Sequence, residues 1–239
     1  MAKKIELTAQ LIKNFAKKST NRQHYVVSRI LIVCEGEKTE PNYFKAFHQF
    51  NNGIFVVDLD FDGGGVNTIQ VVDIALKLKK KAEKKHNPYD AVWAVFDRDS
   101  FKPVKFNAAI SKAEANQISC AWSNEAFELW YLLHFEYRNT PMSRCEYWDT
   151  IARHINQSPL YKKKKAYKYK KNDENHYVEM GYYGDVETAL RNAKRLNELW
   201  ENDTHYARHN PRTLVYKLVC QLLGKDKRFN QFIKSKMGE

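Results

Sequence analysis

The stretches RILIVCEGEKTE (residues 29–40) and AVWAVFDRD (residues 91–99) decide the fold of this chain. Each contains a short apolar run that stops at carboxylates, and the first run is rich in β-branched residues. Such runs are typical of strands buried on both faces of a parallel sheet. Glu35 follows the first run, and Asp97 and Asp99 end the second. These acids either form one site or merely terminate two strands.

Strand-like and helix-like patterns alternate from residue 29 to about residue 135. The apolar run at residues 30–34 is followed by helical spacing of apolar residues. The run at residues 54–61 is followed by a glycine turn and a long amphipathic pattern, and the run at residues 91–96 by a further helical pattern. Strands that alternate with helices imply right-handed crossovers and a mostly parallel sheet. We therefore expect an α/β domain over residues 29–135, with strands at residues 30–34, 54–61, 91–96 and 118–122. Acids alternate with apolar residues in the second of these strands, which places it near an edge of the sheet.

Ligands of an open α/β sheet bind outside the carboxyl ends of its strands. Glu35 and Asp97 each occupy that end of a strongly apolar strand, so we expect Glu35, Asp97 and Asp99 to converge on one crevice. A bare cluster of carboxylates repels itself, whereas a divalent cation that prefers oxygen ligands makes it favourable. The three acids together predict a metal site, with Mg²⁺ as the cofactor and Mn²⁺ as an alternative. Any one of them alone is better explained as a cap on a turn or helix.

The segment SNEAFELWYLLHF (residues 123–135) predicts a helix that begins just after the fourth strand, with Asn124 as its cap. Glu128 lies in the middle of this apolar segment, where an ionised carboxylate is costly unless it is paired or bound to metal. We expect Glu128 to be a further metal ligand or a support for the other ligands. A buried ion pair with an arginine or lysine is an equal alternative.

The charge of the chain predicts an anionic partner. Its 239 residues carry a formal net charge of +12, which favours nucleic acid or a membrane surface. No stretch approaches the roughly 20 apolar residues of a membrane span. The four cysteines are scattered without a CxxC pair, which fits a reducing cytoplasm and argues against structural zinc. We expect a soluble cytoplasmic protein without membrane contact.

Basic segments flank the α/β domain. Residues 1–28 form a basic arm, and residues 136–239 form a basic, mainly helical region that packs on the domain, with one helix capped by Asp185 and another starting at Asn210 and Pro211. In YKKKKAYKYKK (residues 161–171), lysines suit a phosphate backbone and tyrosines suit stacking on unpaired bases. A solvated loop is the alternative. The nucleic-acid-binding candidates here are Lys162, Lys163, Lys164, Lys165, Tyr167, Lys168, Tyr169, Lys170 and Lys171.

The loop after Glu35 carries three further charges, Glu37, Lys38 and Glu40. Lys38 is a candidate phosphate contact. Solvent-facing loop positions are the simpler interpretation of all three.

The order of these elements resembles the Toprim domain of topoisomerases, primases and overcoming-lysogenization-defect nucleases. More closely, ILIVCEGEKTEPNYF, VFDRD, SNEAFELWYLLHF and NPRTLVYKLV resemble blocks of the RloB family, bacterial Toprim-containing proteins associated with restriction loci and anti-phage defence. The resemblance spans roughly residues 28–220. One departure is visible, because the family segment commonly reads SNP and then a small residue, whereas Glu125 and Ala126 stand here.

The resemblance implies roles for individual residues. Glu35 would serve as acid/base or metal ligand, and Asp97 and Asp99 would hold Mg²⁺. The NPRT block would place Arg212 near a phosphate. Phosphodiester cleavage needs charge stabilisation on the phosphate, an activated nucleophile and a proton for the leaving oxygen, and three carboxylates with a metal supply these.

The function expected from residues and resemblance together is metal-dependent cleavage of nucleic acid, with tRNA as one target, by an effector of anti-phage defence. Its partner class would be an ATPase or another product of the same locus, and self-assembly into a homo-oligomer is left open. A nucleic-acid-binding or sensing subunit without turnover is the alternative. A phosphatase acting on a small substrate would leave the basic region unexplained.

Overall fold

The computed structural model describes residues 26–99 and 102–236, so most of the predicted basic arm (residues 1–28) lies outside the described residues. The elements in chain order are β1 Val26–Cys34, α2 Thr39–Lys45, β2 Phe55–Gly63, α3 Thr68–Lys84, β3 Ala91–Asp97, α4 Pro103–Ala115, β4 Ser119–Asn124, α5 Glu128–Leu132, α6 Arg144–Gln157, α7 His176–Tyr183, α8 Val186–Glu198, the 3₁₀ turn η1 Tyr206–Arg208, β5 Arg212–Thr213, α9 Val215–Leu222 and α10 Lys227–Ser235. None of the helices in these two ranges is both long and apolar enough to cross a membrane.

The strands form one sheet in the order β2-β1-β3-β4-β5. The first four are parallel, and β5 pairs antiparallel with β4. The predicted mostly parallel α/β sheet is therefore confirmed, and β2 is an edge strand as expected. Strands β1 and β3 pair in the register Ile30 to Ala91 through Cys34 to Val95, which brings their carboxyl ends side by side.

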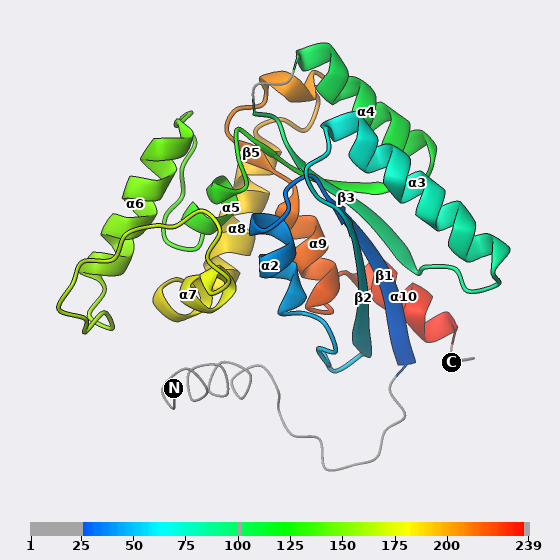
Figure 1. Cartoon of the computed structure of the whole chain (residues 1–239), viewed down its shortest axis with the longest axis horizontal. Helices are drawn as coiled ribbons and strands as arrows, with labels where there is room; N and C mark the ends of the chain where they lie inside the picture. The colour runs from blue at the N-terminus through cyan, green and yellow to red at the C-terminus, as the bar shows by residue number, and fades with distance from the viewer. Residues whose placement is uncertain (1–25, 100–101, 237–239) are drawn as a thin grey trace, which may run out of the picture.

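The two faces of the sheet bury different helices because successive strand residues point to opposite sides. In β1, Leu31 and Val33 belong to the core under α3 and α4, whereas Ile30, Ile32 and Cys34 belong to the core under α2, α5 and α9. Figure 1 shows α3 and α4 together on one side of the sheet and α2 and α9 on the other. Both faces are covered, which explains the continuous apolar runs in the sequence.

The C-terminal region adds a strand to this sheet. Arg212 and Thr213 pair with Asn124 and Ser123 of β4, so the chain is extended at a place where a helix was predicted to start. The prediction that Asn210 and Pro211 begin a helix is wrong, and α9 begins at Val215.

The other incorrect helix start is the one assigned to Asn124. This residue is the last of β4, where its backbone takes part in the pairing with β5. Helix α5 begins later, at Glu128, and Phe127 stands at its N-cap without a side-chain capping bond. The strand pairing therefore outweighs the capping preference of asparagine.

The glycine turn after β2 packs tightly against the end of β1. Gly63 has φ +97°, and a Cβ built on it would lie 2.1 Å from the Cys34 carbonyl oxygen. The Gly64 N–H donates to that same carbonyl oxygen at 2.9 Å. This close backbone approach holds the turn beneath Glu35.

We expect Gly63→Ala to lower the free energy of unfolding by at least about 2 kcal/mol, because an alanine there adopts positive φ and also meets backbone. Gly53→Ala is the matched control, since Gly53 has φ +87° but nothing within 4 Å of its Cβ position. That control should lose only about 1 kcal/mol in urea unfolding. Equal losses in the two variants would show that the close approach to Cys34 does not matter.

Candidate active site

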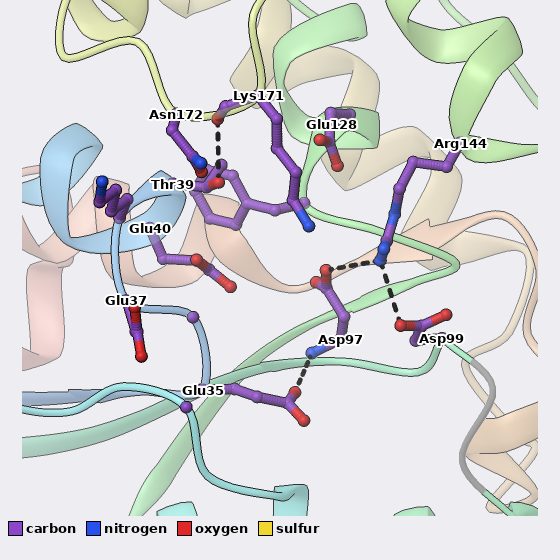
Figure 2. A pocket seen from close by; sticks show the side chains of 14 residues that line it. Glu35, Glu37, Thr39, Glu40, Asp97, Asp99, Glu128, Arg144, Lys171 and Asn172 are labelled. Carbon is purple, nitrogen blue, oxygen red and sulfur yellow. Dashed lines mark hydrogen bonds and ion pairs between the residues drawn. The ribbon is translucent and has the colours of Figure 1, made fainter.

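A pocket of about 410 Å³ lies at the carboxyl ends of β1 and β3. We call it the acidic pocket, because carboxylates from three separate segments, residues 35–40, residues 97–99 and Glu128, line it (Figure 2). Its lining includes Glu35, Glu40, Asp97, Asp99 and Glu128, the cations Lys38, Arg144 and Lys171, and also Gly36, Glu37, Thr39, Gly65, Phe127 and Asn172. The structure thus brings all four predicted metal-binding acids to one place.

Glu35 and Asp97 are fixed by the pairing of their strands. The Glu35 N–H donates to the Val95 carbonyl at 2.9 Å, and the Asp97 N–H donates to Glu35 Oε2 at 3.0 Å. The Glu35 side chain therefore lies across the end of β3. The backbone carbonyl of Glu35 accepts a hydrogen bond from the Gly65 N–H at 2.9 Å, which ties the glycine turn to the end of β1.

Arg144 lies between the two aspartates of the DxD motif. Its Nη2 is 3.6 Å from Asp97 Oδ2 and 3.5 Å from Asp99 Oδ2 (Figure 2). The Asp97 side chain is 15% exposed and that of Asp99 is 41% exposed, so Asp97 faces the interior of the pocket and Asp99 its rim. Arg98 is directed elsewhere, because its Nη1 donates to the Asp99 carbonyl at 2.9 Å.

Glu40 and Glu128 form the buried wall of the pocket. Glu128 is the first residue of α5 and is 1% exposed; Glu40 lies in the first turn of α2 and is 5% exposed. The interpretation of Glu40 as a solvent-facing charge is wrong, because α2 turns it inward. Glu128 Oε1 accepts hydrogen bonds from Trp148 Nε1 at 3.1 Å and from the Tyr169 hydroxyl at 3.3 Å.

The gathered carboxylates shift one another's proton affinity. Burial, opposed by the Asp97 N–H and reinforced by Glu40 and Asp99, raises the pKa of Glu35 to about 7. Burial together with Glu40 and Glu128 raises the pKa of Asp97 well above its ordinary range, although Arg144 acts against the rise. The pKa of Glu40 is likewise raised by burial. Six carboxyl groups line the acidic pocket beside three cations, and burial and mutual repulsion favour protonation of some of these carboxyls.

The donor chemistry of the pocket suits a hard cation such as Mg²⁺, because all of its acids offer oxygen ligands. Within residues 26–99 and 102–236, however, no group of three or more His, Cys, Asp and Glu side chains is already arranged to hold a metal ion. The Arg144 guanidinium lies between Asp97 and Asp99 instead. A cation bound by both aspartates would therefore compete with Arg144 for their oxygens.

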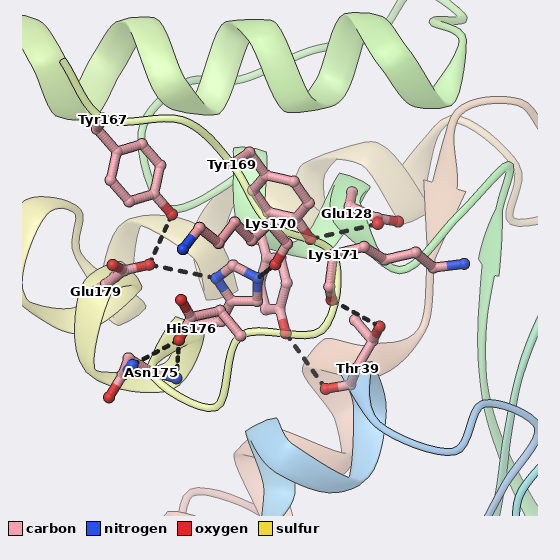
Figure 3. A network of polar contacts seen from close by, with 11 residues as sticks. Thr39, Glu128, Tyr167, Tyr169, Lys170, Lys171, Asn175, His176 and Glu179 are labelled. Atoms are coloured by element: carbon pink, nitrogen blue, oxygen red, sulfur yellow. Dashed lines mark hydrogen bonds and ion pairs between the residues drawn. The ribbon is translucent and has the colours of Figure 1, made fainter.

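The segment 161–171 is pinned to the protein by its tyrosines. The Tyr169 ring stacks on His176 with centroids 4.6 Å apart and planes at 6°, and on Trp148 at 5.9 Å and 15°. The Tyr167 hydroxyl donates to Glu179 Oε2 at 2.7 Å (Figure 3). The rings of Tyr167 and Tyr169, which were predicted to stack on bases, are thus packed against the protein. The alternative prediction of a fully solvated loop does not fit these two residues.

The same segment ends at the acidic pocket. The Lys171 carbonyl accepts from the Thr39 hydroxyl at 3.1 Å, and the Lys171 side chain extends into the pocket (Figures 2 and 3). Its charge acts against the raised pKa of Glu40. Of the lysines predicted to contact nucleic acid, Lys38 and Lys171 line the pocket.

The other predicted binding residues lie elsewhere. Lys162, Lys163, Lys164, Lys165, Lys168 and Lys170 are exposed and do not line the acidic pocket. Arg212 is 7% exposed, and its guanidinium contacts Asn197 Oδ1 at 2.9 Å, His209 Nδ1 at 2.6 Å and the face of Trp122. Arg212 thus anchors β5, and the structure does not bring it to the pocket.

Sequence reasoning missed Arg144 and Glu40. A sequence signal existed for Glu40, because it falls in the first turn of a helix that starts beside Glu35, where carboxylates are favoured. Arg144 follows Ser143, whose capping box with Glu146 marks the start of α6. Nothing in the chain order indicates that this start faces the DxD motif.

We expect the raised pKa of Glu35 to appear as a pH dependence of stability. The folded protein keeps this proton over a range in which the unfolded chain has released it, so the free energy of unfolding falls as pH rises from about 4.5 to about 7. The loss amounts to at most about 3 kcal/mol. Glu35→Gln should lack this part of the decline in urea unfolding with EDTA present. Parallel profiles for wild type and variant would contradict the buried position of the carboxyl.

Comparison with known proteins places the chain in a family. Searches of curated proteins and of solved structures found no match. A family model described as RloB-like protein matches residues 30–222, which confirms the resemblance seen in the sequence blocks. Because that match covers most of the sequence, including every acid of the acidic pocket, this chain belongs to the RloB-like family.

Proposed function

We propose that this protein is a metal-dependent nuclease that cleaves phosphodiester bonds of nucleic acid, with tRNA as one substrate class, as an effector of anti-phage defence. The observation that supports it is that Glu35, Asp97 and Asp99 lie together at the carboxyl ends of β1 and β3. Arg144 and Lys171 line the same pocket. Carboxylates alone would repel a phosphate. The added cations make the pocket suitable for a phosphodiester whose charge grows during attack.

Each residue has a distinct part in this proposal. Asp97 and Asp99 would hold Mg²⁺ or Mn²⁺, with Glu128 and Glu40 as neighbouring ligands or supports, and the ion would supply charge stabilisation on the phosphate and a more acidic water. Glu35, whose pKa of about 7 lies near working pH, suits transfer of a proton to or from the reacting oxygens. Lys171 and Lys38 would contact phosphate oxygens.

A binding or sensing subunit without turnover is the second candidate. It is favoured by one observation, the position of Arg144 between the two aspartates, because a guanidinium there stabilises the acids without any metal. Under that alternative the pocket is a structural ion cluster. The two candidates differ in whether the carboxylates are needed for chemistry or only for folding.

A cleavage assay tests the proposal. We expect purified protein to cut tRNA, single-stranded DNA or duplex DNA with Mg²⁺ or Mn²⁺ and not with EDTA. Glu35→Gln and Asp97→Asn should each lower the cleavage rate at least about 100-fold, because each removes a group that acts in the transition state. Glu201→Gln, at an exposed position away from the pocket, is the control.

Cleavage that persists in both variants would overturn the assignment of the site. Nucleic-acid binding without cleavage under all metal conditions, including with products of the neighbouring genes added, would support the binding subunit instead.

A second measurement addresses Arg144. Arg144→Gln leaves Asp97 and Asp99 without their counter-charge, so we expect a lower melting temperature in EDTA and a larger rise on adding Mg²⁺ than in wild type. An extra rise of about 2–4 °C would correspond to about 1 kcal/mol. Arg153→Gln, at an exposed position of the same helix, should behave as wild type. An unchanged Mg²⁺ response in Arg144→Gln would show that arginine and metal do not compete.

A further inference from the structure

The C-terminal half of α3 and the C-cap residue that follows it carry a set of exposed lysines that do not line the acidic pocket. We call Lys77, Lys80, Lys81, Lys84 and Lys85 the lysine stripe. They follow the spacing i, i+3, i+4, i+7 and i+8, so they lie on one side of the helix. Together with Asp73 and Leu76 they line a shallow groove on the outer surface of α3.

The lysine stripe is not neutralised by the protein. Other lysines have acidic partners: Lys112 pairs with Asp73, Lys225 with Glu187, and Lys236 with Asp90. No ion pair of the five stripe lysines is found in the described parts of the chain. The acid at the upstream end of the groove, Asp73, is already engaged by Lys112 of α4.

This arrangement opposes helix formation. Lysines four residues apart repel each other, and each such pair destabilises an isolated helix by about 0.2–0.5 kcal/mol. Helix α3 forms in spite of this because Val71, Val72, Ala75 and Ala82 are buried on its opposite face and because Asn67 and Gln70 form a capping box. The stripe is therefore a concentrated positive charge on a rigid element.

We propose that the lysine stripe binds the phosphate backbone of a nucleic-acid duplex segment that flanks the bond held in the acidic pocket. The inference rests on the proposed function for the identity of the polyanion. Neutralising phosphates releases their counterions and at the same time relieves the repulsion between the lysines. A membrane surface fits less well, because the large exposed apolar side chains of the described residues, Val27, Val104, Leu160, Leu199 and Phe232, all lie outside α3.

The position of the stripe sets a length for the ligand. Helix α3 begins at Thr68, close in sequence to Gly65 of the acidic pocket, and runs away from it along the sheet (Figure 1). At 1.5 Å per residue the lysine stripe lies about 14–26 Å along the helix. A duplex that leaves the pocket along α3 covers this distance in about 4–8 base pairs. Shorter stems do not reach the far lysines.

Binding measured in EDTA tests the proposal without cleavage. The stripe variant carries Gln at Lys80, Lys81, Lys84 and Lys85. The charge-matched control carries Gln at exposed lysines outside α3, namely Lys105, Lys194, Lys227 and Lys234. The probes are RNA and DNA duplexes of about 24 base pairs and hairpins with stems of about 4 base pairs, chosen from the reach of the stripe.

We expect the stripe variant to bind the long duplex at least about 10-fold more weakly at about 0.1 M salt, with a log K against log salt slope flatter by about 2–4. Its affinity for the short hairpin should change less than about 2-fold, and the control should keep both affinities within about 3-fold. The RNA and DNA arms show which backbone is preferred.

Equal losses in the stripe variant and the control would overturn the proposal, because net charge would then explain the effect. Absence of duplex binding by wild type would also overturn it, as would binding to phosphatidylserine vesicles that the stripe variant loses while it keeps duplex affinity. Failure of the nuclease proposal can be told apart from failure of this one. If the protein never cleaves nucleic acid but the stripe variant shows the expected loss of duplex affinity, the binding role of the lysine stripe stands and the nuclease proposal falls.

Discussion

The parallel pairing of β1 with β3 is the constraint on which the acidic pocket depends. The register that aligns Cys34 with Val95 also places Glu35 beside Asp97, and the Asp97 N–H bonds directly to the Glu35 carboxylate. A slip of one residue in this pairing would turn one strand over relative to the other, so its side chains would face the opposite core. The same apolar alternation that builds the two cores therefore also fixes the distance between the first two acids of the site.

The part of the chain before residue 136 contributes all the acids of the acidic pocket and one of its cations, Lys38. Among these acids, Glu40 and Glu128 stand in the first turns of α2 and α5. Arg144 and Lys171 come from the part after residue 136. The stacking of Tyr169 between Trp148 and His176 holds the segment that ends at Lys171, and the Tyr169 hydroxyl also bonds Glu128. Folding of the C-terminal region thus supplies two of the three cations that offset the carboxylates of the acidic pocket.

The fold could be predicted from the sequence because hydrophobic periodicity is a local property. The parallel sheet follows from the alternation of strand-like and helix-like patterns along the chain. Glu35, Asp97 and Asp99 could be predicted as site residues because ligands of an open α/β sheet bind at the carboxyl ends of its parallel strands. The remainder of the site depends on tertiary contacts. Arg144 reaches the aspartates through the packing of α6 on α5, which no local pattern encodes. The start predicted at Asn210 and Pro211 was wrong because a strand pairing across the chain outweighed a sound local signal.

The lysine stripe and the acidic pocket are far enough apart for their charges to act independently. A chain of net charge +12 attracts polyanions, whereas carboxylates outnumber cations in its acidic pocket. At physiological ionic strength exposed charges are screened over about 8 Å, and the lysine stripe begins about 14 Å along α3 from the helix start beside the pocket. The stripe lysines therefore do not neutralise the carboxylates, and the carboxylates do not weaken the stripe. Within the pocket the acids are offset by the adjacent cations Lys38, Arg144 and Lys171, and the screened lysine stripe adds little to that local balance.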